Sequence, residues 1–141
     1  MTISDYSDLE KEIKNAPEPQ ILPAGTEVKG RIVKVDGGIS EKNNAEWHSV
    51  TYDVPNEVLC PMFNDFFWEL SDHDKIDPKQ YQQSLRQFKT FAEAFNLDYS
   101  RPFSWEDDLP GLEGWMILKV VKDKKGEYPD RNGVAKYIVP R

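Results

Sequence analysis

Apolar residues recur at helical spacing over one long segment, residues 77–96. When residues advance by about 100° each, the apolar side chains fall on one narrow face and polar side chains occupy the other. Asp77 suits the N-cap, Pro78 the first helical position, and Asn96 a left-handed C-terminal cap. The segment is therefore predicted to form one helix that packs on a sheet. Its apolar face consists of Tyr81, Leu85, Phe88, Ala92 and Phe95.

Alternating apolar and polar positions predict five β-strands around this helix. Gly30 interrupts the first strand, and a glycine inside a strand often marks a bulge or bend. After such a bend Val33 and Val35 would turn inward, so the first strand is expected to serve two sheets or both sides of a barrel. The expected strands are residues 26–35, 47–54, 62–70, 115–122 and 134–139.

The order of these elements is β-β-β-α-β-β, with a bent first strand and the helix between strands three and four. That is the order of an OB-fold barrel. The predicted fold class is therefore mainly β with one helix, arranged as a five-stranded OB-fold-like barrel. An open antiparallel α+β sandwich is the alternative that the same string of elements allows. The fold class alone does not fix the function.

The length of 141 residues suits one compact domain that needs no disulfide or metal for its core. Residues 1–20 are acidic, contain few apolar side chains and include Pro17 and Pro19, so they are predicted to form a flexible N-terminal arm before a folded domain at residues 21–141. The single Cys60 fits a reducing compartment. Because neither a signal peptide nor a membrane-spanning apolar run is recognisable, we expect a cytoplasmic protein without a membrane partner.

Few residues indicate catalysis or metal binding. His48 and His73 lie on different predicted elements, and neither has a Cys, Asp or Glu at a ligand spacing that repeats elsewhere. Residues 72–77 superficially resemble a calcium loop, but the central glycine is missing and Gln83 stands where a bidentate Glu belongs. Cys60 has no neighbouring base or cation to activate it. We therefore expect no enzyme activity, no metal site and no cofactor.

The charged residues are distributed unevenly along the chain. A formal net charge of -7 argues against tight, indiscriminate binding to polyanions. Residues 53–77 are rich in carboxylates, whereas Lys and Arg are concentrated from residue 119 onward. Together with cations of the first strand and first loop, these are predicted to line a groove for a phosphate backbone. The candidate phosphate-binding residues are Lys29, Arg31, Lys34, Lys42, Lys119, Lys122, Lys124, Lys125, Arg131 and Lys136.

Aromatic residues are interleaved with these cations and are candidates for stacking on bases, each stack contributing about 1–3 kcal/mol. The candidates are Trp47, Trp115, Tyr128 and Tyr137. The alternative for each of them is burial in the core, and a lysine-rich turn is often simply solvated. Tyr128 lies between charged residues of a predicted loop, so it is the aromatic most expected at the surface.

Short motifs from about Leu22 to the C-terminus carry a family resemblance. They are Leu22-Pro23-Ala24-Gly25 before residues 31–35, Asp108-Leu109-Pro110-Gly111, Leu118-Lys119-Val120, and the positions Gly126, Asn132 and Val134. In these motifs the chain resembles phage-encoded OB-fold single-stranded DNA-binding proteins of replication and recombination modules. The resemblance implies that DNA lies across the strand face and the loops at residues 36–46 and 122–131. Such proteins often recruit replication partners through an acidic C-terminal tail. This chain departs from that pattern: it ends in Val139-Pro140-Arg141, and its acidic segment is residues 1–20, so the role is either missing or moved to that segment.

The leading prediction is therefore a non-enzymatic protein whose partner is single-stranded DNA. The alternative is an acidic OB-like module that binds another protein and no nucleic acid. The two hypotheses differ in whether the basic residues converge on one surface.

Overall fold

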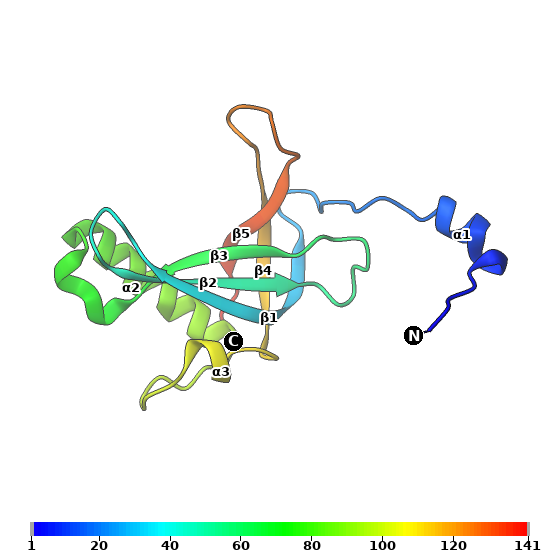
Figure 1. Cartoon of the computed structure of the whole chain (residues 1–141). Helices are drawn as coiled ribbons and strands as arrows, with labels where there is room; N and C mark the ends of the chain where they lie inside the picture. The colour runs from blue at the N-terminus through cyan, green and yellow to red at the C-terminus, as the bar shows by residue number, and fades with distance from the viewer. Residues whose placement is uncertain (1, 141) are drawn as a thin grey trace.

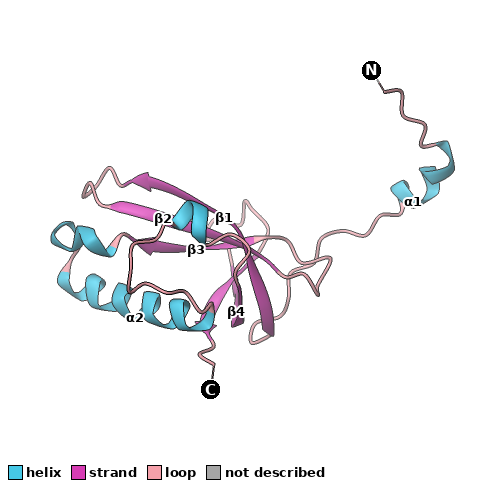
Figure 2. Ribbon diagram, turned by 90° about the horizontal axis from the view of Figure 1, so that it is seen from below, coloured by secondary structure: helices cyan, strands magenta, loops and turns pink. Residues whose placement is uncertain are grey.

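The computed structural model describes residues 2–140. Five antiparallel strands form one open sheet in the order β3-β2-β1-β4-β5. The long helix α2 lies between β3 and β4 in the chain and along one side of the strands (Figure 1, Figure 2). The mainly β class is thus confirmed. The strands are β1 (Glu27–Ile39), β2 (Glu46–Asp53), β3 (Phe63–Trp68), β4 (Glu113–Val121) and β5 (Arg131–Tyr137).

The structure contains more helices than the single one that the sequence predicts. Besides α2 (Pro78–Ala94), the described residues contain two short α-helices and two 3₁₀ helices. They lie in segments where local turns and caps suffice, such as Ser104, whose hydroxyl accepts a hydrogen bond from the Asp107 N–H at 3.2 Å. The additional helices are η1 (Ser7–Leu9), α1 (Glu10–Lys14), η2 (Leu70–Lys75) and α3 (Trp105–Asp108).

Strand β1 pairs with two neighbours in succession within one open sheet, rather than serving two sheets or a closed barrel. Residues 27–31 pair with β4, and residues 31–39 pair with β2. The irregularity lies at Val33, which the β1–β2 register skips, rather than at Gly30. Val33 therefore stays exposed and does not turn inward, whereas Val35 is buried. Gly30 instead allows close packing, because a Cβ at this position would lie 2.7 Å from the Cε atom of Met116.

Helix α2 begins and ends as its sequence predicts. The Asp77 carboxylate accepts hydrogen bonds from the backbone N–H groups of the first turn, and Asn96 adopts a left-handed conformation with a φ of 54°. The buried face is wider than predicted, since Phe91 is fully buried. Phe91 packs against Phe67 of β3, with ring centroids 4.8 Å apart, and also against Trp105 of α3.

The predicted barrel is not closed by backbone hydrogen bonds, because no ladder joins β3 to β5 within residues 2–140. Side chains connect these two edge strands instead. The Tyr137 hydroxyl of β5 donates to Asp65 Oδ2 of β3 at 2.6 Å and lies 2.7 Å from the Tyr52 hydroxyl of β2. Burial raises the pKa of both tyrosines well above the ordinary value, so both hydroxyls stay neutral.

The N-terminal arm lies away from the sheet (Figure 1). Every described residue up to Gln20 is exposed, including the apolar side chains of Ile3 and Ile13. The first backbone hydrogen bond to the domain comes from the Gln20 N–H, which donates to the Leu59 carbonyl at 2.8 Å. Among residues 2–140 no helix has the length and apolar character needed to cross a bilayer.

Candidate nucleic-acid interface

The predicted phosphate-binding residues of β1 are engaged by carboxylates. Arg31 donates to both oxygens of Asp53, at 3.2 and 2.7 Å, and this hydrogen bonding together with the negative charge raises the pKa of Arg31. The other two cations have one carboxylate partner each. Their positive charge is therefore largely compensated before any ligand arrives. The ion pairs are Lys29–Glu113 at 3.6 Å, Arg31–Asp53 at 2.7 Å and Lys34–Asp36 at 3.4 Å.

The remaining predicted cations form no ion pair within residues 2–140, and all of them are exposed. Arg86 on α2, which the sequence did not single out, shares both properties. No ion pair among the described residues therefore has to be broken before these side chains bind a polyanion. The unpaired predicted cations are Lys42, Lys119, Lys122, Lys124, Lys125, Arg131 and Lys136.

A groove runs where the edge strands β3 and β5 meet without a ladder. One part, of about 340 Å³, is lined by Asn64–Phe66 of β3, by Lys119 and Val121 of β4, and by residues 131–134. A larger part, of about 1060 Å³, shares Asp65, Lys119 and Val134 with it and continues to Trp115 and Lys136. We call the two parts together the seam groove.

The seam groove brings together unpaired cations and exposed aromatic rings. Lys119, Arg131 and Lys136 line it, and Arg86 joins them from α2. The Lys119 side chain crosses Gly133, where a Cβ would lie 3.2 Å from Lys119 Cε. Two aromatic residues, Phe66 and Trp115, lie at the groove with 43% and 46% of their surface exposed. Positive charge and flat apolar surface therefore occur side by side.

Phe66 belongs to a cluster on the side of β2 and β3 that points away from the core. Its ring centroid lies 5.8 Å from that of Trp47 and 4.9 Å from that of Trp68. Trp47 and Trp68 face each other in the β2–β3 register. The Trp47 indole covers Gly38 of β1, where a Cβ would lie only 2.6 Å from the ring. We call Trp47, Phe66 and Trp68 the aromatic platform.

The sequence prediction included Trp47 but missed Phe66 and Trp68. The signal was present, because strand periodicity divides the aromatics of β3 between its two faces. Phe63 and Phe67 are buried on the core side, while Phe66 and Trp68 fall on the opposite side. From the sequence we predict a strand over residues 62–70 without separating its two faces.

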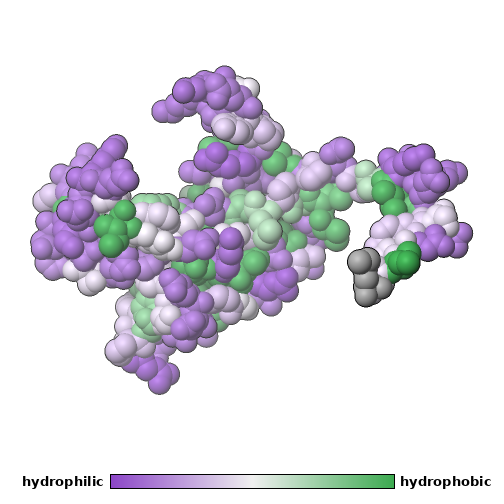
Figure 3. Space-filling view, in the orientation of Figure 1, coloured by the Kyte–Doolittle hydropathy of each residue, from purple (hydrophilic) through white to green (hydrophobic). Residues whose placement is uncertain are grey.

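Four predicted residues lie together in the β4–β5 loop, residues 122–130, which projects from the sheet (Figure 1) and is hydrophilic (Figure 3). The Asp123 carboxylate shapes this loop by accepting hydrogen bonds from the backbone N–H groups of Glu127 and Tyr128, at 2.8 and 3.1 Å. Tyr128 is 71% exposed. The loop leaves β4 at Val121 and enters β5 at Arg131, both of which line the groove. Its predicted ligand-binding residues are Lys122, Lys124, Lys125 and Tyr128.

Of two further predicted residues, Lys42 lies in the loop where it was expected, although this loop is shorter than predicted, and Tyr137 does not lie at the surface. Lys42 lies in the β1–β2 loop, which spans only residues 40–45 because β1 continues to Ile39, and not the predicted residues 36–46. Tyr137 was predicted to stack on bases, and this prediction was wrong. It is only 5% exposed and its hydroxyl is fixed by Tyr52 and Asp65, so its ring offers no free face.

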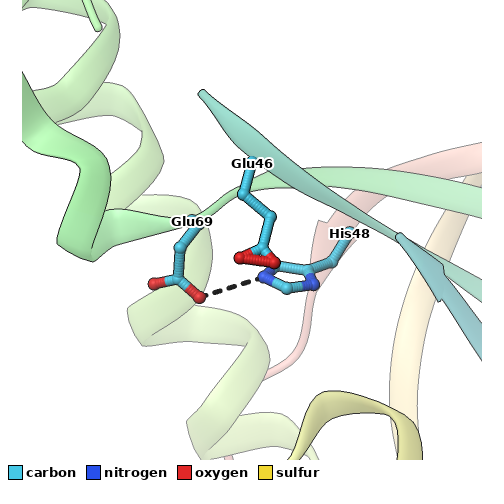
Figure 4. A group of neighbouring side chains, drawn as sticks. All are labelled: Glu46, His48 and Glu69. Atoms are coloured by element: carbon cyan, nitrogen blue, oxygen red, sulfur yellow. Dashed lines mark hydrogen bonds and ion pairs between the residues drawn. The ribbon is translucent and has the colours of Figure 1, made fainter. Parts of the chain in front are cut away.

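A separate cluster joins Glu46, His48 and Glu69, whose ligand atoms all lie within 4.8 Å of one another (Figure 4). The sequence shows no repeated ligand spacing around His48, whereas the fold places two carboxylates beside it. Glu46 precedes it by two residues on one face of β2, and Glu69 follows β3. Burial raises the pKa of Glu69, but hydrogen bonds from Ser71 and His48 outweigh this effect and leave that pKa below its ordinary value.

Comparison with known proteins does not assign the chain to a family. No protein-family model matches the sequence, and no curated protein matches it. The resemblance to phage DNA-binding proteins therefore stays a prediction. The function has to be inferred from the seam groove and the aromatic platform.

Proposed function

We propose that the protein binds single-stranded DNA without catalysing a reaction, and that the strand lies along the seam groove. The observation that carries this proposal is the convergence of Lys119, Arg131 and Lys136, which form no ion pairs with the described residues, with the exposed rings of Phe66 and Trp115. The cations neutralise phosphates. The rings stack on bases, which contributes about 1–3 kcal/mol per base.

Exposed aromatic rings favour a single strand over a duplex. In a duplex the flat faces of the bases are stacked on one another and are inaccessible to protein side chains. The aromatic platform adds two further rings, Trp47 and Trp68, which are half-buried next to Phe66. With a net charge of -7, the chain also lacks the excess of cations typical of proteins that coat duplex DNA through phosphate contacts alone.

The order of the strands supports the finer assignment of an OB-fold-like barrel. Helix α2 lies between β3 and β4 in the chain, and β1 bends between two partners. The hydrogen bond between Tyr137 and Asp65 holds β5 next to β3, where a barrel of this type closes. OB folds bind oligonucleotides on the face of strands two and three and on the loops one–two and four–five. In this proposal the aromatic platform and the β4–β5 loop take these roles.

A second function is favoured by the N-terminal arm. Ile3, Tyr6, Leu9 and Ile13 are exposed within an acidic segment. Exposed apolar side chains flanked by carboxylates fit a protein partner rather than DNA. In the proposed role, this partner is a replication or recombination protein of the phage type, and the arm and the groove act independently. In the alternative, the protein is only an interaction module.

A titration of fluorescently labelled oligo-dT with the full chain tests the proposal. We expect binding at low salt that weakens as salt rises, with a slope in log–log form of about 0.7 for each phosphate contact. A duplex of the same length is the matched control and should bind more weakly, because its bases cannot stack on the protein. Absence of oligo-dT binding at low salt would overturn the proposal and leave the interaction module.

A further inference from the structure

We propose that Glu46, His48 and Glu69 bind one divalent transition-metal ion, with Zn²⁺ the best fit. The three side chains meet at the corner where β2 begins and β3 ends (Figure 4). They offer one imidazole nitrogen and two carboxylates whose ligand atoms lie within 4.8 Å of one another. The cluster is separate from the seam groove, so this proposal does not depend on DNA binding.

The backbone fixes the positions of all three residues. Glu46 and His48 are two residues apart on β2, so their side chains point to the same face. The register pairs Trp47 with Trp68, which brings Glu69 opposite Glu46. The Glu69 N–H also donates to the Glu46 carbonyl at 2.9 Å. The site therefore needs no rearrangement of the backbone to form.

The imidazole of His48 is held in one orientation. His48 is 5% exposed, and its ring stacks on Trp105 with centroids 4.3 Å apart and planes 9° apart. Its Nε2 atom lies 3.1 Å from Glu69 Oε1. Two ligand atoms on a tetrahedral Zn²⁺ with bonds of about 2.0–2.2 Å are about 3.4 Å apart. Nitrogen and oxygen thus already have nearly the separation that one bridging ion requires.

Glu46 adds a second carboxylate beside the His48–Glu69 pair. Its carboxylate forms neither a hydrogen bond nor an ion pair within residues 2–140, although it lies beside a second carboxylate. No Lys or Arg in the described part of the chain forms an ion pair with Glu69 either. Two neighbouring carboxylates repel each other, and a divalent cation bound between them would remove this repulsion.

The ligand types select the ion. An imidazole ligand favours Zn²⁺ and its first-row neighbours over Mg²⁺ and Ca²⁺, which prefer all-oxygen sites. The cluster has no thiolate, which disfavours Cu⁺. Glu46 is exposed, so an ion reaches the site from solvent and water fills the fourth position. Binding would connect the start of β2 to the segment after β3 and stabilise the folded state.

Calorimetric titration of the metal-free full chain with ZnCl₂ tests the proposal, together with thermal unfolding at each zinc concentration. We expect one bound equivalent and a rise in Tm. His48→Gln should abolish this site. Glu46→Gln changes an exposed side chain whose carboxylate has no hydrogen bond among the described residues, so it should fold normally and bind Zn²⁺ at least about tenfold more weakly. The matched control is His73→Gln, an exposed histidine outside the cluster, which should bind like the parent.

Three results of the zinc titrations would overturn the proposal. The parent chain fails to bind Zn²⁺, the Glu46→Gln variant binds it with the affinity of the parent, or the His73→Gln variant no longer binds one Zn²⁺ per chain. The same titration with MgCl₂ is expected to give much weaker binding. If Mg²⁺ and Zn²⁺ bound equally, the site would be a carboxylate pair without a role for His48, which contradicts the proposed ligand set.

Discussion

Strand β1 and the pair β4–β5 both direct cations away from the core, but the two regions differ in what lies opposite. Arg31 pairs with Asp53 on one side and Glu113 on the other, and Glu113 also binds Lys29. On β4 and β5 the residues opposite the cations are uncharged. These cross-strand pairs are Lys119 with Gly133, Arg131 with Val121, and Lys136 with Ile117.

This difference shows that strand register decides which cations remain free for a ligand. A paired lysine must exchange a carboxylate for a phosphate and gains little, whereas an unpaired lysine gains the whole interaction with the phosphate. The sequence predicted both groups as one phosphate-binding surface. The structure separates a compensated region on β1 from a region along the seam groove whose cations form no ion pair within residues 2–140, which we call the uncompensated region. Glu27 and Asp65 also line this groove.

The largest expected effect comes from reversing charge in the uncompensated region. We expect the double variant Lys119→Glu/Arg131→Glu to bind oligo-dT on the order of 100-fold more weakly at low salt, because two attractions become repulsions. The matched control is Lys29→Glu/Lys34→Glu, which changes the net charge equally and should lose only a few-fold. Equal losses in the two variants, measured by fluorescence titration, would remove the distinction between the regions.

Removing the rings of the seam groove separates stacking from charge. Phe66→Ala and Trp115→Ala are each expected to cost about 1–3 kcal/mol of binding with little change in the salt slope, since stacking releases no counterions. Titrations at three salt concentrations measure both quantities. Tyr128→Ala tests the β4–β5 loop in the same way. If the loop closes over DNA, this variant should also lose binding with little change in the salt slope. A change of slope without a loss of affinity would show that these rings do not stack on bases.

The link between the two edge strands sets the geometry of the uncompensated region. Tyr137→Phe removes the donor to Asp65 and the partner of Tyr52, and we expect a loss of about 1–3 kcal/mol in the free energy of unfolding. Denaturant titration measures this loss. The matched control is Tyr99→Phe, which removes a hydroxyl from an exposed tyrosine and should leave stability unchanged.

Tyr52 and Tyr137 should also make the free energy of unfolding depend on pH, and this dependence checks the interpretation. Their pKa is raised in the fold by burial, whereas in the unfolded chain a tyrosine ionises near pH 10. The unfolded state therefore loses protons first. Stability should be constant with respect to these groups below about pH 10 and fall above it, and the fall should be shallower in Tyr137→Phe. An unchanged alkaline slope would show that Tyr137 is not the group responsible.

The β4–β5 loop extends the uncompensated region, and its contribution should be smaller. Lys124→Ala with Lys125→Ala is expected to weaken binding equally for all sequences and to reduce the salt slope by about 1.4, because phosphate contacts carry no base information. Thermal stability should barely change. If this variant binds like the parent at every salt concentration, the loop lies outside the DNA site.

The smallest effect is expected from the arm, which belongs to neither region. Deleting residues 1–19 leaves the hydrogen bond of Gln20 in place and should change Tm very little, because the removed side chains that the structure describes are exposed. Differential scanning calorimetry measures this. A fall of many degrees would show that Leu9 and Ile13 pack on the domain or on a second copy.

The sequence by itself determined the elements whose cause is local. Helix α2 follows from its apolar period, from Asp77 at the N-cap and from Asn96 after its end, all of which lie within one short segment of the chain. The alternation of apolar and polar residues over 47–54 likewise predicts the buried face of β2, where Val50 and Tyr52 are fully buried. These features depend on backbone geometry that neighbouring residues set, so one sequence suffices to predict them.

Only the tertiary structure decided which side chains are free. Tyr137 is buried, and Asp65, far away in the sequence, accepts a hydrogen bond from its hydroxyl across the seam. Lys29 is compensated and Lys119 is not, because strand register brings Glu113 close to one and Gly133 opposite the other. Strand register and the approach of β3 to β5 are set by packing between distant segments of the chain. A register shift of one residue would exchange the inner and outer faces of a strand. Local sequence patterns carry no information about that packing.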